Sequence, residues 1–127
     1  MVRPTAKDLT GRELEIMHVF WERGEATIAE VRAQMAGSGL DRAHTTIATL
    51  VRILGEKGFL EAVDSGRPAR YRPSRSFEEV SRRLLGDVLE RVFKGSSEDL
   101  LVRLVEQRRL TTKERARLRQ ILGEDGP

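Results

Sequence analysis

The chain has no cysteine, only two histidines and few aromatic residues, and each shortage excludes a class of site. Without cysteine there is no disulfide, no thiolate metal site and no cysteine nucleophile. His18 and His44 lie in no spacing with each other that is typical of a metal site. His18 does have Glu15 and Glu22 nearby on one helical face, but a lone histidine of this kind is usually solvated or partly buried. The sequence therefore predicts no metal site and no cofactor.

Long apolar runs are missing as well. No stretch approaches the roughly 20 apolar residues that a membrane-spanning helix needs, and the N-terminal residues lack the apolar segment of a signal peptide. The sequence contains neither a glycine-rich phosphate loop nor the motif that presents a nucleophilic serine. We therefore expect a cytoplasmic protein that does not insert into membranes and is not an enzyme.

Charge is abundant, and its distribution is more informative than its sum. The 127 residues include 23 lysines and arginines against 20 aspartates and glutamates, which leaves a net charge of only +3. A charged fraction of 34% and a hydrophobic fraction of 39% are ordinary for a folded, helix-rich protein. Residues 65–77, however, contain four arginines and no acid. This local stretch, more than the overall balance, favours an anionic partner.

Two capping boxes mark the starts of the first two expected helices. Thr10 and Thr27 are each followed three residues later by a glutamate, a pattern in which the two side chains satisfy free backbone N–H groups. We expect a helix over 11–23, ended by Gly24, and a shorter helix that is broken by the glycines of 37–39. Together with a third helix they predict a tri-helical core.

The third helix, expected over 43–57, has one apolar and one polar face. We expect Asp41 to cap its start and Gly58 to end it. The apolar face has helical spacing and consists of Ile47, Leu50, Val51 and Leu54. The polar face has no acid until Glu56 and consists of His44, Thr45, Ala48, Thr49 and Arg52.

A β-hairpin is expected to follow this helix. Residues 59–63 are rich in strand formers, residues 64–67 have turn chemistry, and residues 69–72 return as the second strand. Because an isolated hairpin is marginal in water, Leu60 and Tyr71 should pack on the helices. A tri-helical core followed by such a hairpin predicts a winged helix-turn-helix, with the third helix for recognition and the hairpin as the wing.

An acid-free helix face beside an arginine-rich hairpin suits the major groove of DNA, since threonine and arginine side chains can contact base edges or phosphates. We expect contacts from the start and polar face of the third helix: Arg42, Ala43, His44, Thr45, Thr46, Thr49 and Arg52. We expect phosphate or minor-groove contacts from the wing arginines: Arg67, Arg70 and Arg72. The helix starts at Thr10 and Thr27 could also offer backbone N–H groups to phosphates.

Three alternatives remain open at this point. The helix face could be an ordinary solvated surface, although such a surface usually mixes glutamate with lysine. The arginines could keep an edge strand basic and so prevent aggregation. The whole unit could be a winged-helix protein-interaction module that docks on a protein without binding DNA, although an acidic recognition face would favour that alternative more.

Residues 76–127 are expected to form three amphipathic helices. A segment of roughly 50 residues is below the size at which a core usually holds by itself, so the apolar faces should be shared between two copies of the chain. The expected interface residues are Phe77, Val80, Leu84, Val88, Val92, Leu101, Leu104, Leu118 and Ile121. The fold class is thus mainly α with a small β-hairpin: a DNA-binding winged helix-turn-helix over 1–75 and a helical dimerisation domain over 76–127.

Four segments carry a resemblance to a known family: LTGRELEIM at 9–17 with Trp21, HTTIATLVRILGEKGFL at 44–60, GRPARYRP at 66–73, and the all-helical tail. In this order and spacing, from Leu9 to Leu122, the sequence resembles the penicillinase-repressor family, the BlaI/MecI/CopY-type transcriptional regulators. The resemblance implies a DNA-binding winged helix-turn-helix, a dimerisation domain, and sequence-specific repression by a homodimer on a pseudo-palindromic operator.

The resemblance also bears on how repression is relieved. Members of the family are commonly cleaved within the dimerisation domain after a membrane sensor-protease is activated, which makes such a protease a candidate partner. The β-lactam-responsive members are cut at an Asn-Phe pair, where this sequence has Arg103-Leu104, so that cleavage is not carried over. The copper-responsive branch uses a C-terminal cysteine cluster, and this chain has no cysteine. The operator, the regulated genes and the inducing signal do not follow from the sequence.

Overall fold

A computed structural model describes residues 9–63 and 66–124 and divides the chain into two compact units, with the division between Leu84 and Leu85. Residues 1–8, which we expect from their polar sequence and Pro4 to form an arm, and the first two residues of the expected wing turn, Asp64 and Ser65, lie outside the described residues. The predicted domain boundary at 75/76 stays a prediction.

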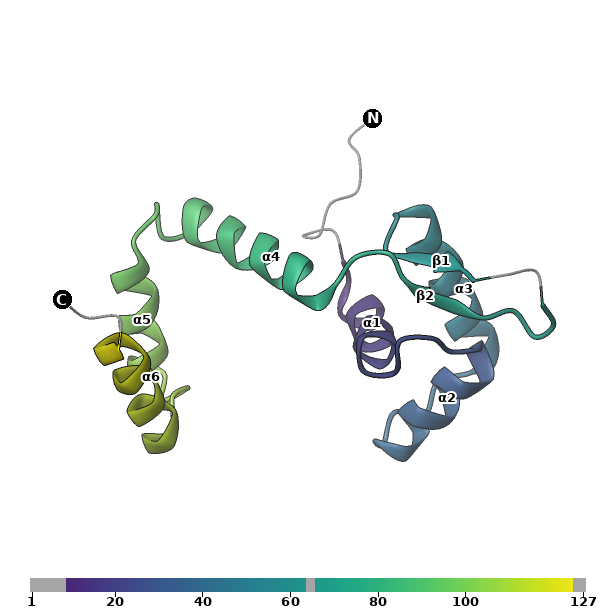
Figure 1. Cartoon of the computed structure of the whole chain (residues 1–127), viewed down its shortest axis with the longest axis horizontal. Helices are drawn as coiled ribbons and strands as arrows, with labels where there is room; N and C mark the ends of the chain where they lie inside the picture. Colours follow the sequence, from purple (N-terminus) through teal and green to yellow (C-terminus); the bar gives the residue numbers. More distant parts are fainter. Residues whose placement is uncertain (1–8, 64–65, 125–127) are drawn as a thin grey trace. The chain divides into compact units, whose positions relative to one another are not determined.

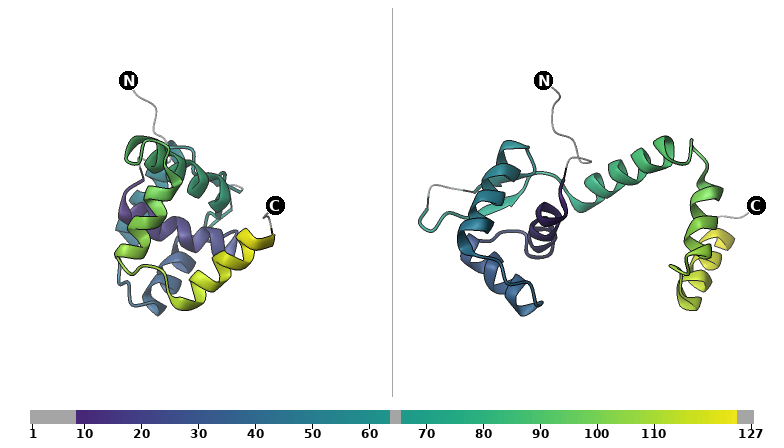
Figure 2. Two further views of the ribbon diagram at one scale, coloured as in Figure 1. Left: turned by 90° about the vertical axis from the view of Figure 1, so that its left-hand side faces the viewer. Right: turned by 180° about the vertical axis from the view of Figure 1, so that it is seen from behind.

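Three helices build the first unit: α1 (Gly11–Arg23), α2 (Ile28–Gly37) and α3 (His44–Glu56). They lie together in the views of Figures 1 and 2. Both predicted capping boxes are present. The Glu13 amide donates to the Thr10 hydroxyl at 3.1 Å, and the Thr10 amide donates to Glu13 Oε1 at 2.7 Å. The equivalent distances for Thr27 and Glu30 are 3.1 and 2.8 Å, so both helices begin where these donors are satisfied.

The predicted cap of the third helix is wrong. Ala43, not Asp41, is the N-cap of α3, and its backbone is extended with φ −67° and ψ 147°. Asp41 lies two residues too early, in the loop that follows the end of α2, where the Leu40 amide still donates to the Met35 carbonyl at 2.9 Å. The predicted end is confirmed: Lys57 caps the helix, and Gly58 follows with φ +87°, a backbone conformation that residues other than glycine rarely adopt.

All three helices contribute their apolar faces to one core. Phe20, Ile47 and Leu54 are fully buried, and Phe59 closes the core from the chain that follows α3. Leu50, which the sequence placed inward, and Trp21 are only partly buried and pack at its margin. The whole buried set comprises Ile16, Met17, Val19, Phe20, Ala26, Val31, Met35, Ile47, Val51, Leu54, Phe59, Leu60 and Val80.

The hairpin consists of β1 (Leu60–Ala62) and β2 (Tyr71–Pro73), paired antiparallel with Leu60 opposite Pro73. It is anchored by a contact that the sequence did not predict. Ala26, between α1 and α2, forms a bridge to Tyr71, with N–O distances of 3.1 and 3.0 Å between their backbones. Because an isolated hairpin is marginal in water, this extra backbone pairing and the packing of Leu60 hold the wing against the helices.

Helix α4 (Phe77–Arg91) begins in the first unit and continues beyond the division. Ser76 caps it, since the Glu79 amide donates to the Ser76 hydroxyl at 3.1 Å. Val80 is 2% exposed and belongs to the core of the first unit, and Leu84 packs against that core. For Val80 this corrects the predicted dimer interface, because a side chain buried within its own chain has no surface left for a second copy; for the other residues the interface stays a prediction.

The second unit contains the end of α4, α5 (Ser97–Glu106) and α6 (Thr112–Glu124). Ser96 caps α5 by accepting from the Asp99 amide at 3.1 Å, and Thr111 and Glu114 form a capping box at the start of α6. No side chain of this unit whose burial is described is buried. In the part of the chain that the structure describes, no helix has the length and apolar character needed to cross a membrane.

Candidate nucleic-acid interface

The outer face of α3 carries the predicted groove residues. His44, Thr45, Thr49 and Arg52 are exposed, whereas Thr46 is half-buried because it borders the core face. The Arg52 Nη1 atom lies 3.0 Å from Glu56 Oε2, but both side chains are more than 60% exposed. Such an exposed pair contributes at most about 0.5 kcal/mol, so the Arg52 guanidinium can exchange it for another anion. The face is therefore fixed in position by the core while its polar groups remain available.

The first turn of α3 differs from those of α1 and α2. Among the described residues, no side chain caps α3, whereas threonine hydroxyls occupy amide groups at the starts of the other two helices. An uncapped helix start leaves backbone N–H groups that are open to water or to an anion. The start of α3 can therefore offer backbone donors in addition to those expected at Thr10 and Thr27.

The side chains of Thr10 and Thr27 have structural roles. Thr27 is only 6% exposed, and its hydroxyl and amide both bond to Glu30. The Thr27 side chain therefore cannot reach a nucleic acid, whereas the prediction for this helix start concerned its backbone N–H groups and stays a prediction. Thr10 is exposed, but its amide and hydroxyl are used in the same way with Glu13.

Arg42 precedes α3 and is held by α1. Its Nη2 atom lies 3.1 Å from both carboxylate oxygens of Glu15, and its Nε atom lies 3.3 Å from one of them. About a quarter of each side chain is exposed. A paired guanidinium with three such contacts ties the start of α3 to α1, so this arginine positions the helix before it contacts anything outside.

The wing arginines differ in how strongly they are held. Arg67 is exposed and has no ion pair with another described residue. Arg72 lies across the hairpin from Glu61, with 3.4 Å between Nε and Oε1 and about half of each side chain exposed. Because a pair this exposed is weak, both Arg67 and Arg72 can turn to a phosphate.

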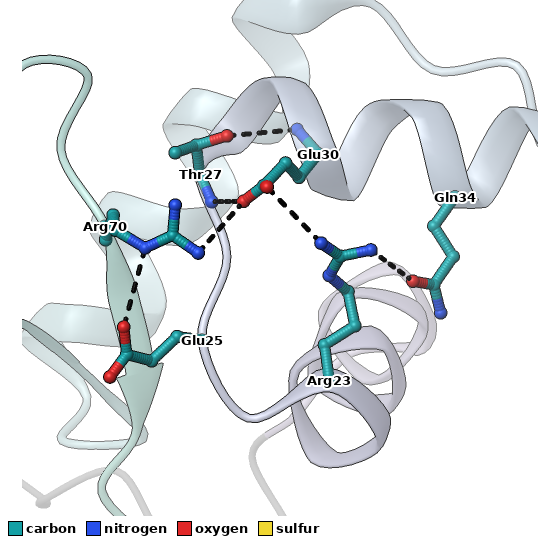
Figure 3. Close-up of polar contacts among 6 residues, drawn as sticks. All are labelled: Arg23, Glu25, Thr27, Glu30, Gln34 and Arg70. Atoms are coloured by element: carbon teal, nitrogen blue, oxygen red, sulfur yellow. Dashed lines mark hydrogen bonds and ion pairs between the residues drawn. The ribbon is translucent and has the colours of Figure 1, made fainter.

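Arg70, in contrast, belongs to a network at the start of α2 (Figure 3). Its Nε atom lies 3.5 Å from Glu25, and its Nη2 atom lies 3.4 Å from Glu30. Glu30 also pairs with Arg23 at 3.4 Å. The hydrogen bond from the Thr27 amide, outweighing the opposing effect of burial and helped by Arg70 and Arg23, lowers the pKa of Glu30. The network thus favours the charged form of Glu30 and links the wing to α2.

Sequence reasoning missed one buried ion pair. Lys57 Nζ lies 3.0 and 3.1 Å from the two carboxylate oxygens of Glu13, which is almost fully buried. Burial raises the pKa of Glu13, but the hydrogen bond from the Thr10 amide and the contact with Lys57 outweigh it, so the pKa is lowered overall. The sequence signalled Glu13 only as part of a capping box, and no local pattern connects residues 44 positions apart.

Trp21 is a second missed link. Its indole Nε1 donates to the Arg75 carbonyl at 2.9 Å, and the Arg75 guanidinium lies 5.3 Å from the centre of the Phe59 ring. Arg75 is therefore used to join the end of the wing to α1 and the core. Among the described residues there is no group of three or more histidine, cysteine, aspartate or glutamate side chains that could hold a metal ion.

Comparison with known proteins agrees with this architecture. The model of the penicillinase repressor family matches residues 9–124. The methicillin resistance regulatory protein MecI of Mammaliicoccus sciuri and that of Staphylococcus aureus are each 25% identical over 121 residues, covering 92% of this chain and 94% of the relative.

Solved structures support the fold. A complex structure of hsRosR-S1 has a TM-score of 0.57 at 18% identity and covers 94% of both chains. The structure of RosR from h. salinarum, grown from NaBr, has a TM-score of 0.53 at 18% identity and covers 95% of this chain and 96% of that one. The match over residues 9–124, together with the tri-helical core and wing, shows that the chain belongs to the penicillinase repressor family of DNA-binding transcriptional repressors and is not an enzyme.

Proposed function

We propose that the chain represses transcription as a homodimer, with α3 of each copy in the major groove of one half of a pseudo-palindromic operator. One observation carries this proposal: the exposed face of α3 presents histidine, threonine and arginine without an acid until Glu56, while the opposite face is locked into the core. A rigid helix with small polar side chains can approach base edges closely, and no carboxylate on that face repels phosphates before its last turn.

The groove contacts come from the exposed members of this face: His44, Thr45, Thr49 and Arg52. Arg67 and Arg72 hold phosphates from the wing, and the uncapped first turn of α3 adds backbone N–H groups. Arg42 and Arg70 act through position, because their carboxylate partners fasten the start of α3 and the wing to the rest of the unit.

The apolar surface of the second unit supports dimerisation. Leu85, Val92 and Leu122 are more than half exposed, and Val88, Leu101 and Ile121 are more than 40% exposed. Each such side chain contributes about 1.5–3 kcal/mol when it is moved from water into a core. Val102 and Val105 add to the surface, and these two, like Leu85 and Leu122, were not part of the predicted interface. A self-complementary pairing of two copies buries these faces and places two copies of α3 for a two-fold symmetric operator.

The proposed site of action is the cytoplasm, where the operator is. By resemblance to its family, a membrane sensor-protease is the candidate partner that relieves repression, with the second unit as the segment it would act on. Arg103 and Leu104 stand at the family's cleavage position on α5. Arg103 is exposed and Leu104 is half-buried.

Duplex DNA from upstream of the protein's own gene provides the test, with fluorescence anisotropy measured over a series of salt concentrations. Thr49→Ala should change the preference among operator variants, because Thr49 faces the bases. Arg67→Ala should weaken binding to all sequences and reduce the salt slope by about 1, because it removes one phosphate contact. The control is Arg115→Ala, which removes an exposed arginine of α6 and should leave the slope unchanged.

Two results would contradict the proposal. If the folded, dimeric protein binds none of these duplexes at low salt, the chain is a winged-helix protein-interaction module. If it binds DNA but Thr49→Ala and Arg67→Ala both behave like the parent, the contacts are made by another surface.

A further inference from the structure

A hollow of about 650 Å³ lies on the first unit, away from the outer face of α3. It is formed where the end of α1, the end of β2 and the first turn of α4 meet. Four aromatic residues line it: Phe20, which is fully buried, and His18, Trp21 and Phe77, whose rings contact one another. None of the proposed DNA contacts lines it. The hollow is therefore a feature that the DNA-binding function leaves unused.

The rings are held in fixed orientations. Trp21 and Phe77 meet edge to face with 5.3 Å between ring centres, and His18 and Trp21 do the same at 5.3 Å. The hydrogen bond from the Trp21 indole to the Arg75 carbonyl fixes the indole further. Phe77 is nevertheless 46% exposed, so part of an aromatic surface faces the hollow and the solvent at a place where a core residue would be covered.

The charged residues that line the hollow have one sign. Glu22 and Glu78 line it, both are exposed, and neither has an ion pair with another described residue. Neither lysine nor arginine is among the described lining residues. A bound anion would be repelled by two carboxylates, whereas a cation would be attracted both by them and by the faces of the aromatic rings.

We propose that this hollow binds a small organic cation with an apolar body, of the arylalkyl ammonium class. The apolar body lies against Trp21 and Phe77, and the ammonium group lies between the rings and the carboxylates of Glu22 and Glu78. Because the floor includes the first turn of α4, the helix that continues into the second unit, an occupant also bears on the segment that joins DNA binding to dimerisation.

The ligand site can be tested directly, because Trp21 is the only tryptophan in the chain and its fluorescence reports on the hollow. The full-length protein is titrated with benzyltrimethylammonium and, separately, with phenylmethanesulfonate, which has a similar size and the opposite charge. We expect saturable quenching or a shift of the emission with the cation, and affinity for the anion lower by at least about tenfold.

Variants locate the binding. Glu22→Gln/Glu78→Gln should lower the affinity for the cation by about tenfold and reduce the difference in affinity between cation and anion. The control is Glu90→Gln, which removes an exposed carboxylate farther along α4 and should change neither affinity. Phe77→Leu should also lower the affinity for the cation, because leucine keeps the apolar volume but has no ring face. Equal affinity for both probes, or an unsaturable response in the parent, would overturn the proposal.

The coupling to repression rests on the proposed function and is measured separately. Operator affinity is determined with and without saturating benzyltrimethylammonium, and a change in the parent that is absent in Glu22→Gln/Glu78→Gln assigns the effect to the hollow. Cation binding by fluorescence without any operator binding would overturn the proposed function and leave the ligand site standing. Operator binding without cation binding would overturn the ligand site and leave the proposed function standing.

Discussion

The buried pair between Glu13 and Lys57 allows a quantitative prediction for Lys57→Met. The substitution keeps most of the apolar stem and removes the ammonium group that lies 3.0 and 3.1 Å from the two Glu13 oxygens. Glu13 is then left charged with its side chain only 3% exposed. Removing one partner of a buried pair is costly, because the remaining charge has neither water nor counter-ion around it.

The magnitude follows from distance and burial. At 3.0 Å and an effective dielectric constant of about 20, the attraction is about 5.5 kcal/mol, and the desolvation of both groups offsets part of it. The Thr10 amide still donates to Glu13 at 2.7 Å in the variant and limits the loss. We therefore expect Lys57→Met to lower the free energy of unfolding by about 3 kcal/mol, the lower end of the range for broken buried pairs.

The assay is urea unfolding of the full chain at one protein concentration, followed by Trp21 fluorescence, since Trp21 lies on α1 beside the core of the first unit. The chain offers a matched control. Arg52 and Glu56 are also 3.0 Å apart, but both are more than 60% exposed, so Arg52→Met should cost at most about 0.5 kcal/mol.

A double variant tests the cause. Glu13→Gln/Lys57→Met removes both charges, and glutamine at this position can still complete the capping box with Thr10. It should recover most of the stability that Lys57→Met loses. The reasoning is refuted if Lys57→Met unfolds within about 0.5 kcal/mol of the parent, or if the double variant is no more stable than Lys57→Met.

Three further predictions follow from individual contacts. The pKa of Glu13 is lowered in the folded state, so the charged carboxylate stabilises the fold above pH 4.5, its usual pKa. This stabilisation is lost as the pH falls through the lower folded pKa, so Glu13→Gln should flatten the acid limb of a plot of unfolding free energy against pH. Val92→Asp should shift the protein toward monomer in sedimentation experiments, whereas the neighbouring substitution Arg91→Ala should not. Trp21→Phe should lower the calorimetric stability by about 1 kcal/mol or more, because the Arg75 carbonyl loses its donor.

Much of the first unit could be predicted from the sequence because the signals are local. The capping boxes at Thr10 and Thr27 and the glycines that end α1 and α3 act over three or four residues, and the structure has each of them. The inward face of α3 also follows from spacing alone. Asp41 shows the limit of this reasoning, because a good capping residue caps only if the chain enters the helix beside it, and here the loop after α2 delays the start to Ala43.

The candidate site could be predicted as a face but not residue by residue. The sequence marked Arg67, Arg70 and Arg72 as equivalent, since they share one short basic stretch. The structure separates them, because Arg70 lies close to Glu25 and Glu30 while Arg67 has no ion pair with another described residue. Which carboxylate a guanidinium meets depends on how the wing folds onto α2, and neither periodicity nor composition contains that information.

By itself the sequence determined the helices, their faces, the presence of a wing and a family resemblance, because hydrophobic spacing and capping act within one turn or one face. Only the tertiary structure decided that Val80 belongs to the first core, that Ala26 bonds to Tyr71, and that Lys57 neutralises Glu13. These contacts join residues tens of positions apart. Their existence depends on the packing of whole elements, which fixes where each side chain ends and which charges meet.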